Sequence, residues 1–343
     1  MALPMPVSPD KQPMSLQAAL AAYLESISLA RSANTARTYR NALAAFTESL
    51  KLEHIDLIQT PASAADEAWV STFARYLKHY APASERLYLT AVSSWYEFLV
   101  AEGLAAVNLP RVRQLIRIRA RRPGQRLPQF AREAIEGVVE YAARLASLPA
   151  ADEEDRLRQM RDAAFLLTLA DTGLRVHEAC NLRRGDLDMR EARALLIGKG
   201  DRQAVVRFSH RSLRALQSYL EARCLRDGQS GRPLASLPIF ARHDRGAAKK
   251  IMPISTTTGR AIVHERTYEA LGQQAAAGIT PHSFRHYFVT AVLRGSRGNL
   301  KLAQELARHR NIAVTQRYAH LSDDELDREY YDIFDHPSYD PDA

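Results

Sequence analysis

A short arginine-rich segment divides this chain and limits it to an architecture of at least two parts. Residues 111–130 contain seven arginines and no acidic residue. Pro123, Gly124 and Pro128 interrupt the segment, and such residues favour irregular structure. Before it, eight basic residues are outnumbered by ten acidic ones, so nearly all of the net charge of +8 lies in this segment. The sequence therefore predicts a basic linker over 111–130 between two domains.

This basic linker has two interpretations. A run of like charges is often only a solvated spacer. Alternatively, it is a strap that neutralises DNA phosphates, which would make binding sensitive to salt. We favour the strap, whose candidate DNA-contacting residues are Arg111, Arg113, Arg117, Arg119, Arg121 and Arg122.

Length and composition exclude several classes of protein. With 343 residues, 46% of them hydrophobic, the chain can bury more than one core. Its longest apolar runs are too short to span a membrane. Residues 1–13 lack the features of a secretory signal and are expected to be a flexible lead-in. Cys180 and Cys224 are the two cysteines, too few for a disulfide framework or a cysteine zinc site, so we expect a reducing cytoplasm.

Helical periodicity dominates the expected N-terminal domain, residues 14–110. Helices are predicted over 15–29, 34–50, 65–80 and 84–101. The last of these should turn Leu87 and Trp95 inward. Polar faces of such a bundle either enter a DNA major groove or are ordinary solvated surfaces. The candidate DNA contacts on these faces are Arg37, Arg40 and Arg86.

The expected second domain, residues 131–321, mixes helices with a hairpin. Helices are predicted over 131–146 and 154–170, and short β-prone runs over 194–197 and 203–208. Lys199 lies in the glycine-flanked turn between these runs. Such a lysine is either merely solvated or placed to reach a ligand. The whole chain should be mainly α with a small antiparallel β-sheet.

Several cationic side chains of this second domain suit chemistry on a phosphodiester. Gly173 should end a helix in the left-handed conformation and place Arg175 on a rigid corner, with Glu178 as its ion-pair partner. Thr280 and Pro281 predict a helix start, next to which His282 and Arg285 share one face.

Two further residues complete the chemical set. His309 follows the apolar helix predicted over 300–307, and Tyr318 comes nine residues later. Each has an ordinary explanation by itself, because a histidine at a helix end is favoured by the dipole and Tyr318 is one of fourteen tyrosines. Rival nucleophiles on chemistry alone are Tyr330, Tyr331 and Tyr339.

In this order, the residues resemble the signature of the tyrosine site-specific recombinases, the family of phage integrases, Xer proteins and Cre. The resemblance runs from about Leu16 to Phe334. It implies a helical core-binding domain and an α+β catalytic domain that form a C-shaped clamp on DNA. The implied catalytic residues are Arg175, Lys199, His282, Arg285, His309 and Tyr318, with Glu178 in support. The chain departs from the family's usual Leu-Gly-His at Ala307-Arg308-His309, which puts the local backbone turn in question.

The resemblance also implies a mechanism. Tyr318 would attack the scissile phosphate to give a 3′-phosphotyrosine and a free 5′-hydroxyl. Arg175, Arg285 and His309 would hold the non-bridging oxygens, where charge builds up. His282 would assist proton transfer from Tyr318, and Lys199 would protonate the departing oxygen. Neither a cofactor, ATP nor a metal is expected.

The expected partner is double-stranded DNA with specific recombination sites, and accessory DNA-bending proteins are a further possibility. The protein should be a monomer, or weakly associated, when free and a tetramer on DNA. The C-terminal segment 322–343 begins with a capping box and carries an apolar stripe. It either packs on its own domain or is exchanged between protomers, which we favour. The protein should be cytoplasmic, and associated with the nucleoid when bound.

Two alternative functions remain at this point. A type IB topoisomerase resembles the same catalytic residues but relaxes DNA as a monomer. A non-catalytic architectural or regulatory DNA-binding protein would need no complete catalytic set, so the full set of matched residues argues against it.

Overall fold

The computed structural model describes residues 13–121, 132–198, 202–244, 250–276, 278–309 and 311–316. The chain forms two compact units, 1–125 and 126–343. The described part of the first unit is helical, whereas the second unit combines helices with one small antiparallel sheet. The predicted fold class is therefore confirmed. No helix within these ranges is long and apolar enough to cross a membrane.

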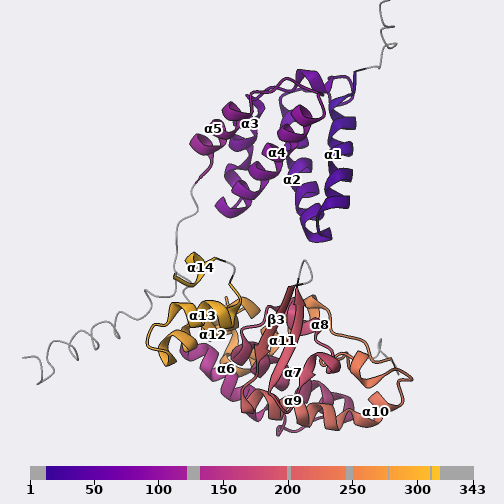
Figure 1. Cartoon of the computed structure of the whole chain (residues 1–343), viewed down its shortest axis with the longest axis vertical. Helices are drawn as coiled ribbons and strands as arrows, with labels where there is room; N and C mark the ends of the chain where they lie inside the picture. Colours follow the sequence, from indigo (N-terminus) through magenta and orange to yellow (C-terminus); the bar gives the residue numbers. More distant parts are fainter. Residues whose placement is uncertain are drawn as a thin grey trace, which may run out of the picture. The chain divides into compact units, whose positions relative to one another are not determined.

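The first unit packs its helices around an aromatic core (Figure 1). Its α-helices are α1 (Leu16–Ala30), α2 (Ala33–Leu52), α3 (Trp69–Tyr76), α4 (Pro82–Ala101) and α5 (Leu109–Arg119). Phe46 of α2 meets the rings of Phe73, Trp95 and Tyr96 at centroid distances of 5.2, 5.5 and 6.5 Å. All four side chains are fully buried. Such edge-to-face contacts add to the stabilisation from apolar burial and fix how α2, α3 and α4 pack.

Helix α5 corrects the predicted linker. Asn108 caps α5 by accepting a 3.0 Å hydrogen bond from the backbone N–H of Arg111. Val112 is fully buried and Leu115 and Ile116 pack against the core of the first unit. The prediction of a linker over 111–130 is therefore wrong for residues up to 119. The arginines alternate with a narrow stripe of apolar residues at helical spacing. This stripe packs on the core of the first unit, so the segment belongs to that unit.

A buried carboxylate corrects the predicted orientation of α4. Leu87, expected inside, is 46% exposed, whereas Glu85 is fully buried. Glu85 accepts hydrogen bonds from Lys78 and Arg121. Burial alone would raise the pKa of Glu85, but these hydrogen bonds lower it below its usual value. Trp95, also expected inside, is fully buried, so the prediction was right for the middle of the helix and wrong near its start.

The second unit begins with two helices that pack on one another and continues through a hairpin. Its elements are α6 (Arg132–Leu145), α7 (Glu153–Thr172), α8 (Val176–Asn181), β1 (Leu187–Asp188), β2 (Arg193–Gly198), β3 (Arg202–Arg207), α9 (His210–Ala222), α10 (Cys224–Gly228), α11 (Thr256–Ala276), α12 (Pro281–Gly295), α13 (Leu300–Ala307) and α14 (Ile312–Gln316). The predicted helices and hairpin are present at these positions.

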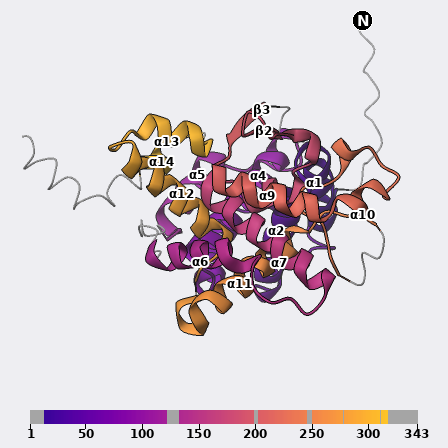
Figure 2. The same cartoon turned by 90° about the horizontal axis from the view of Figure 1, so that it is seen from below.

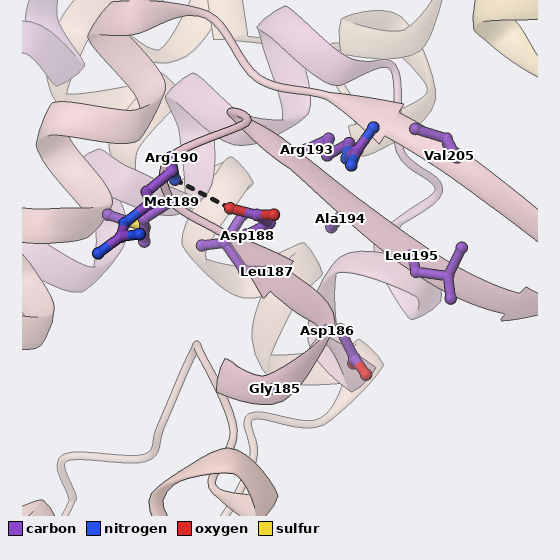
Figure 3. A pocket seen from close by; sticks show the side chains of 10 residues that line it. All are labelled: Gly185, Asp186, Leu187, Asp188, Met189, Arg190, Arg193, Ala194, Leu195 and Val205. Atoms are coloured by element: carbon purple, nitrogen blue, oxygen red, sulfur yellow. Dashed lines mark hydrogen bonds between the residues drawn. The ribbon is translucent and has the colours of Figure 1, made fainter.

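The sheet alternates between a buried and an open face. Strands β1, β2 and β3 pair antiparallel in that order, and Leu195 lies opposite Val205. Their side chains are 42% and 44% exposed, while the neighbouring Ala194 and Val206 are buried. Leu195 and Val205 line a pocket together with Leu187 of β1 (Figure 3). The period of two along the strands thus places one face against the core of the unit.

Helix α7 is the central element of the second unit. It packs against α6, α9 and α12, as Figures 1 and 2 allow the reader to follow. Phe165 and Leu166 are fully buried in the middle of α7. Helices α12, α13 and α14 lie together at one side of the unit in both views. The end of α7 therefore approaches α12 through direct packing.

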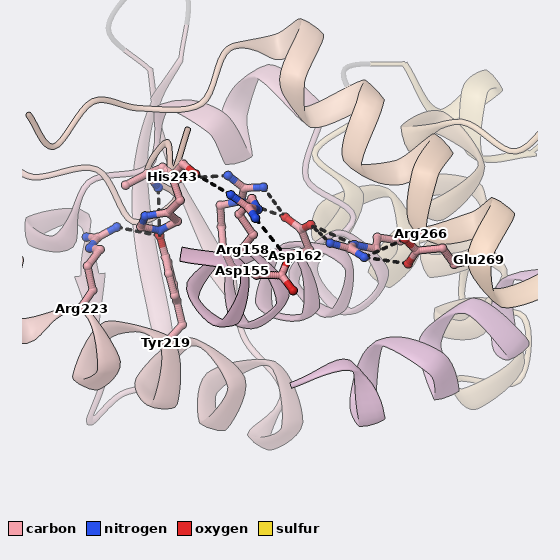
Figure 4. Close-up of polar contacts among 10 residues, drawn as sticks. Asp155, Arg158, Asp162, Tyr219, Arg223, His243, Arg266 and Glu269 are labelled. Carbon is pink, nitrogen blue, oxygen red and sulfur yellow. Dashed lines mark hydrogen bonds and ion pairs between the residues drawn. The ribbon is translucent and has the colours of Figure 1, made fainter. Parts of the chain in front are cut away.

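A buried polar network stiffens this framework (Figure 4). Asp162 of α7 accepts hydrogen bonds from Arg161 and from Arg266 of α11, at 2.8 and 2.9 Å. Arg223, fully buried, pairs with Asp227 at 2.8 Å. Buried charges are costly unless they are paired and hydrogen-bonded, as these are. The network ties helices far apart in the sequence into one scaffold.

Candidate active site

The first corner of the site, the Gly173 corner, comprises Gly173 to Glu178. Helix α7 ends at Gly173, whose φ of 59° lies in the left-handed region that favours glycine. A Cβ atom at this position would lie 2.4 Å from Cδ1 of Phe288 on α12. Both the backbone and the packing therefore require glycine. The chain then turns into α8, with Arg175 at its N-cap position. The predicted glycine cap and helix start are confirmed.

Glu178 fixes Arg175 in two ways. Its Oε1 accepts a hydrogen bond from Nη1 of Arg175 at 3.0 Å, and its Oε2 accepts one from the Arg175 backbone N–H at 2.9 Å. Burial alone would raise the pKa of Glu178, but the Arg175 backbone and the charge of Arg308 hold it below its usual value. The side chain of Arg175 is still 46% exposed, so a ligand can reach its guanidinium.

Helix α12 contributes His282 and Arg285. Thr280 is its N-cap residue and Pro281 occupies its first turn, as predicted. His282 is exposed, whereas Arg285 is only 2% exposed. Nη1 of Arg285 donates to the carbonyl of Gly173, and Nη2 donates to the carbonyl of Ala307. Arg285 thus ties the Gly173 corner to the end of α13.

The second corner, the Arg308 corner, comprises Ala307 to His309. Arg308 is the C-cap residue of α13 and is left-handed, with φ 56° and ψ 43°. The backbone N–H of His309 donates to the carbonyl of Gln304 at 3.0 Å. The Gln304 side chain donates in turn to the carbonyl of His309 at 3.1 Å. The turn that the unusual arginine put in question is therefore present.

The ring of His309 is held from α14. Its Nδ1 lies 2.9 Å from Oγ1 of Thr315, a residue that is fully buried. This contact leaves Nε2 as the second hydrogen-bonding atom of the ring. A ring anchored at one nitrogen presents the other in a fixed direction, which suits a group that must donate to an oxygen of a bound phosphate.

The histidines of the site share one positive environment. Burial, then Arg285 and Arg175, lowers the pKa of His309 to about 4. Partial burial of its ring and the charge of Arg285 also lower the pKa of His282, although the residue as a whole is exposed. Both rings are therefore neutral at pH 7 in the free protein. A bound phosphate would add negative charge and raise both pKa values. The positive environment that lowers these pKa values would favour an anion bound beside the two rings.

The structure adds two residues, Arg308 and His286, to the predicted set. Arg308 contacts Glu178, with Nη2 at 3.3 Å from Oε2. His286 stacks edge-on against His282, with ring centroids 4.2 Å apart, and burial followed by His282 lowers its pKa to about 4. The signal for His286 was its position four residues after His282, which places both on the same face of a helix. No sequence pattern signalled the Arg308 contact, because its partner lies far away in the chain.

Two predicted catalytic residues lie outside the described residues. Lys199 follows Gly198, the last residue of β2, and Tyr318 follows the described chain end at Gln316 by two positions. Their catalytic roles therefore stay predictions. Arg175, His282, Arg285 and His309 are joined by the contacts and charges given above.

The predicted DNA-contacting residues of the bundle are on its surface. Arg37 and Arg40 on α2 and Arg86 on α4 are all exposed. Arg37 and Leu87 line a shallow hollow with neighbouring residues of α2. Their exposure makes the three side chains accessible to a ligand, and their role in binding DNA stays a prediction.

The arginines of the basic segment fall into two groups. Four lie exposed on α5: Arg111, Arg113, Arg117 and Arg119. Arg113 pairs with Glu97 at 2.8 Å on the surface. Arg121 differs, because its backbone and guanidinium both bind the buried Glu85. Because Arg121 pairs with this buried carboxylate and stabilises the first unit, we no longer assign it to the DNA-binding strap. Arg122 lies outside the described residues.

Comparisons with known proteins agree with this geometry. The model of the phage integrase family matches residues 141–325, and that of the phage integrase N-terminal SAM-like domain matches residues 20–103. Tyrosine recombinase XerC of Bacillus pumilus is 31% identical over 242 residues, which are 71% of this chain and 72% of that protein. Tyrosine recombinase XerD of Mycobacterium leprae is 29% identical over 315 residues, 89% of this chain and 92% of that protein.

A solved structure shares the fold. The XerH site-specific recombinase bound to palindromic difH substrate, in a post-cleavage complex, superposes with a TM-score of 0.64 at 16% identity. The match covers 91% of this chain and 83% of that one. The family model spans more than half of the chain, including both corners of the site. This chain belongs to the phage integrase family.

Proposed function

We propose that this protein is a site-specific DNA recombinase that cuts and rejoins strands through a 3′-phosphotyrosine. The observation that carries the proposal is the double connection between the two corners. Arg285 bridges Gly173 and Ala307, and Glu178 contacts both Arg175 and Arg308. This arrangement gathers the cations that a phosphoryl-transfer transition state requires.

The first chemical step is attack of the Tyr318 oxygen on the scissile phosphorus. The new bond joins that oxygen to phosphorus, and the bond to the 5′-oxygen of the next nucleotide breaks. His282 takes the phenolic proton, which its lowered pKa permits because the ring is neutral at pH 7. Lys199 gives a proton to the departing 5′-oxygen.

The two corners would stabilise the negative charge that builds up on the phosphate in the transition state. The exposed edge of Arg175 and Nε2 of His309 would contact the non-bridging oxygens. Arg285 would add its positive charge while it holds the two corners together through the carbonyls of Gly173 and Ala307. In the second step, the 5′-hydroxyl of a partner strand attacks the phosphotyrosine and releases Tyr318. The bond between Tyr318 and phosphorus retains the energy of the broken phosphodiester bond, so the reaction needs no ATP.

DNA binding in this proposal rests on the exposed arginines of the first unit. Those of α2, α4 and α5 would neutralise backbone phosphates, which predicts that affinity falls steeply as salt rises. The protein would act on double-stranded DNA in the cytoplasm, as the absence of a cysteine framework suggests. Four protomers would assemble on two sites, with or without accessory DNA-bending proteins.

Assembly would depend on the C-terminal segment after Ser322. If its apolar stripe docks on a neighbouring protomer, truncation after Ser322 should leave cleavage of a single site intact and abolish pairing of two sites. Analytical ultracentrifugation with one-site and two-site duplexes measures this. Normal pairing of sites by the truncated protein would show instead that the segment packs on its own domain.

The target site is first identified by capture. The protein is mixed with fragmented genomic DNA of the organism that encodes it, denatured, and the DNA that stays covalently attached is sequenced. A nicked duplex carrying the recovered site then loses a short fragment on cleavage, which prevents rejoining and traps the adduct. Wild-type protein should form the adduct, and Tyr318→Phe should not.

Peptide mapping of this adduct identifies the nucleophile. Trypsin cuts after Arg317 and Arg328, so Tyr318 lies in the peptide 318–328, while Tyr330, Tyr331 and Tyr339 lie together in 329–343. A nucleotide adduct on the first peptide supports the assignment. An adduct on the second, or no adduct at all, contradicts it. Recombination of paired sites, rather than relaxation of any supercoiled plasmid, distinguishes a recombinase from a topoisomerase.

A further inference from the structure

Arg308 occupies a backbone conformation that disfavours its own side chain. With φ 56° and ψ 43° it is left-handed, a region where the Cβ atom of an L residue crowds the backbone and glycine is the usual choice. The turn is nonetheless formed, since the backbone N–H of Arg308 donates to Glu305 at 3.0 Å. A residue held in this region needs contacts that over-determine it.

The side chain of Arg308 supplies such contacts. Nη2 lies 3.3 Å from Oε2 of Glu178, and Nη1 donates to the carbonyl of Leu306 at 3.3 Å. The side chains of Arg308 and Glu178 are only 13% and 19% exposed. An ion pair so shielded from water is less sensitive to salt than a surface pair, and removal of one partner leaves the other charge buried without compensation.

Glu178 is therefore shared by two arginines with different surroundings. Its Oε1 holds the guanidinium of Arg175, and its Oε2 accepts from the Arg175 backbone and from Arg308. Arg175 is 46% exposed, whereas Arg308 is largely buried beside it. The carboxylate thus links the exposed cation of the Gly173 corner to the residue that precedes His309.

We propose that Arg308 is a positioning residue, which acts through Glu178 to set Arg175 and His309 in one mutual geometry. This inference rests on the proposed function. Arg285 joins the same corners through backbone carbonyls, and Arg308 joins them through side chains. Two separate connections restrict both translation and rotation of one corner relative to the other. Catalysis needs such restriction, because small misplacements of groups around a phosphate cost rate.

The test separates positioning from mere stabilisation by comparing two left-handed arginines. Arg297 has φ 51° and is exposed near the end of α12. Arg308→Gly and Arg297→Gly both replace a left-handed arginine by glycine, but only the first removes one of the two arginines that contact Glu178. Arg308→Lys keeps the charge. Each variant is measured for thermal unfolding, for affinity for the captured site, and for the single-turnover rate of covalent adduct formation on the nicked duplex.

We expect Arg308→Gly to form the adduct about tenfold to a hundredfold more slowly than wild type. Its melting temperature and DNA affinity should stay close to those of Arg297→Gly, which should cleave at the wild-type rate. Arg308→Lys should recover part of the lost rate. In a Glu178→Gln background, the further change Arg308→Gly should have little effect, because the negative charge that the two arginines share is already removed.

Two results would overturn the inference while leaving the proposed function intact. One is a wild-type rate of adduct formation by Arg308→Gly. The other is an equal loss of rate from Arg308→Gly with and without Glu178, which would mean that Arg308 acts by another route. Failure of the wild-type protein itself to form the adduct would overturn the proposed function, and this inference with it.

Discussion

The two corners of the site adopt almost the same backbone turn, although one has glycine at the left-handed position and the other has arginine. Gly173 has φ 59° and ψ 23°, and Arg308 has φ 56° and ψ 43°. At Gly173 the ring of Phe288 leaves no room for a side chain. At Arg308 the side chain is present and pairs with Glu178. One corner is therefore fixed by steric packing and the other by charge.

This difference predicts different kinds of failure. Packing tolerates no added atom, so the Gly173 corner should be sensitive to volume and insensitive to charge. An ion pair tolerates changes in shape better than loss of a partner, so the Arg308 corner should be sensitive to charge. Damage to either corner should slow the same cleavage step, because Arg285 contacts the carbonyls of both Gly173 and Ala307.

The largest effect is expected from Gly173→Ala. The added methyl group would meet Phe288 and would also strain the left-handed backbone, which together should lower the free energy of unfolding by about 3 kcal/mol. Adduct formation should fall at least about a hundredfold, because Arg175 moves with the corner. Urea unfolding and single-turnover cleavage measure both effects.

Gly298→Ala is the matched control for this substitution. Gly298 also has a positive φ, 75°, but a Cβ atom there would find nothing within 4 Å. Backbone strain alone should lower the unfolding free energy by about 1 kcal/mol and leave cleavage unchanged. Equal losses from the two alanine variants would contradict the steric explanation of the Gly173 corner.

An intermediate effect is expected from Thr315→Val, which removes the hydrogen bond to Nδ1 of His309. The ring would lose its fixed direction, so cleavage should slow about tenfold, as expected for one lost buried hydrogen bond. Thr168→Val makes the same change at a buried hydroxyl that has no partner within the described part of the chain. That control should keep both stability and cleavage. A Thr315→Val protein that cleaves normally would show that His309 needs no anchor.

The smallest effect concerns the pH dependence of stability. The folded pKa values of His286 and His309, both about 4, lie below the ordinary value of about 6.5. The unfolded chain therefore binds more protons between these values, so stability falls as pH falls from about 6.5 toward 4.

Because both rings are partly exposed, each should contribute about 1 kcal/mol between pH 7.5 and pH 5. His309→Asn and His286→Asn should each flatten the profile, which urea unfolding at the two pH values can follow. An unchanged profile in both variants would mean that the site does not depress these pKa values.

Local sequence signals predicted the parts of this fold that depend on near neighbours. The Gly173 cap, the Thr280–Pro281 helix start and the β2–β3 hairpin all follow from residues within a few positions. The local signals gave wrong predictions where a partner far away in the sequence determines whether a side chain is buried. Glu85 is buried because Lys78 and Arg121 reach it, and the latter lies 36 residues away.

The candidate site shows the same division. The ion pair of Arg175 with Glu178 spans three positions and was predicted, whereas the contact of Arg308 with Glu178 spans 130 positions and was not. Charge density likewise indicated a linker, although the apolar stripe of α5 makes residues 111–119 of that segment part of the first unit. Periodicity inside a charged run is thus the signal to examine in similar chains.

The most direct test asks whether both corners hold one phosphate. In Tyr318→Phe protein, the ring carbons of His309 are followed by NMR as pH varies, with the captured DNA site, with an unrelated duplex and without DNA. We predict that the target duplex raises the pKa of His309 from about 4 to at least its ordinary value of about 6.5. A titration of His309 that the target duplex leaves unchanged would contradict a phosphate held between the Gly173 and Arg308 corners.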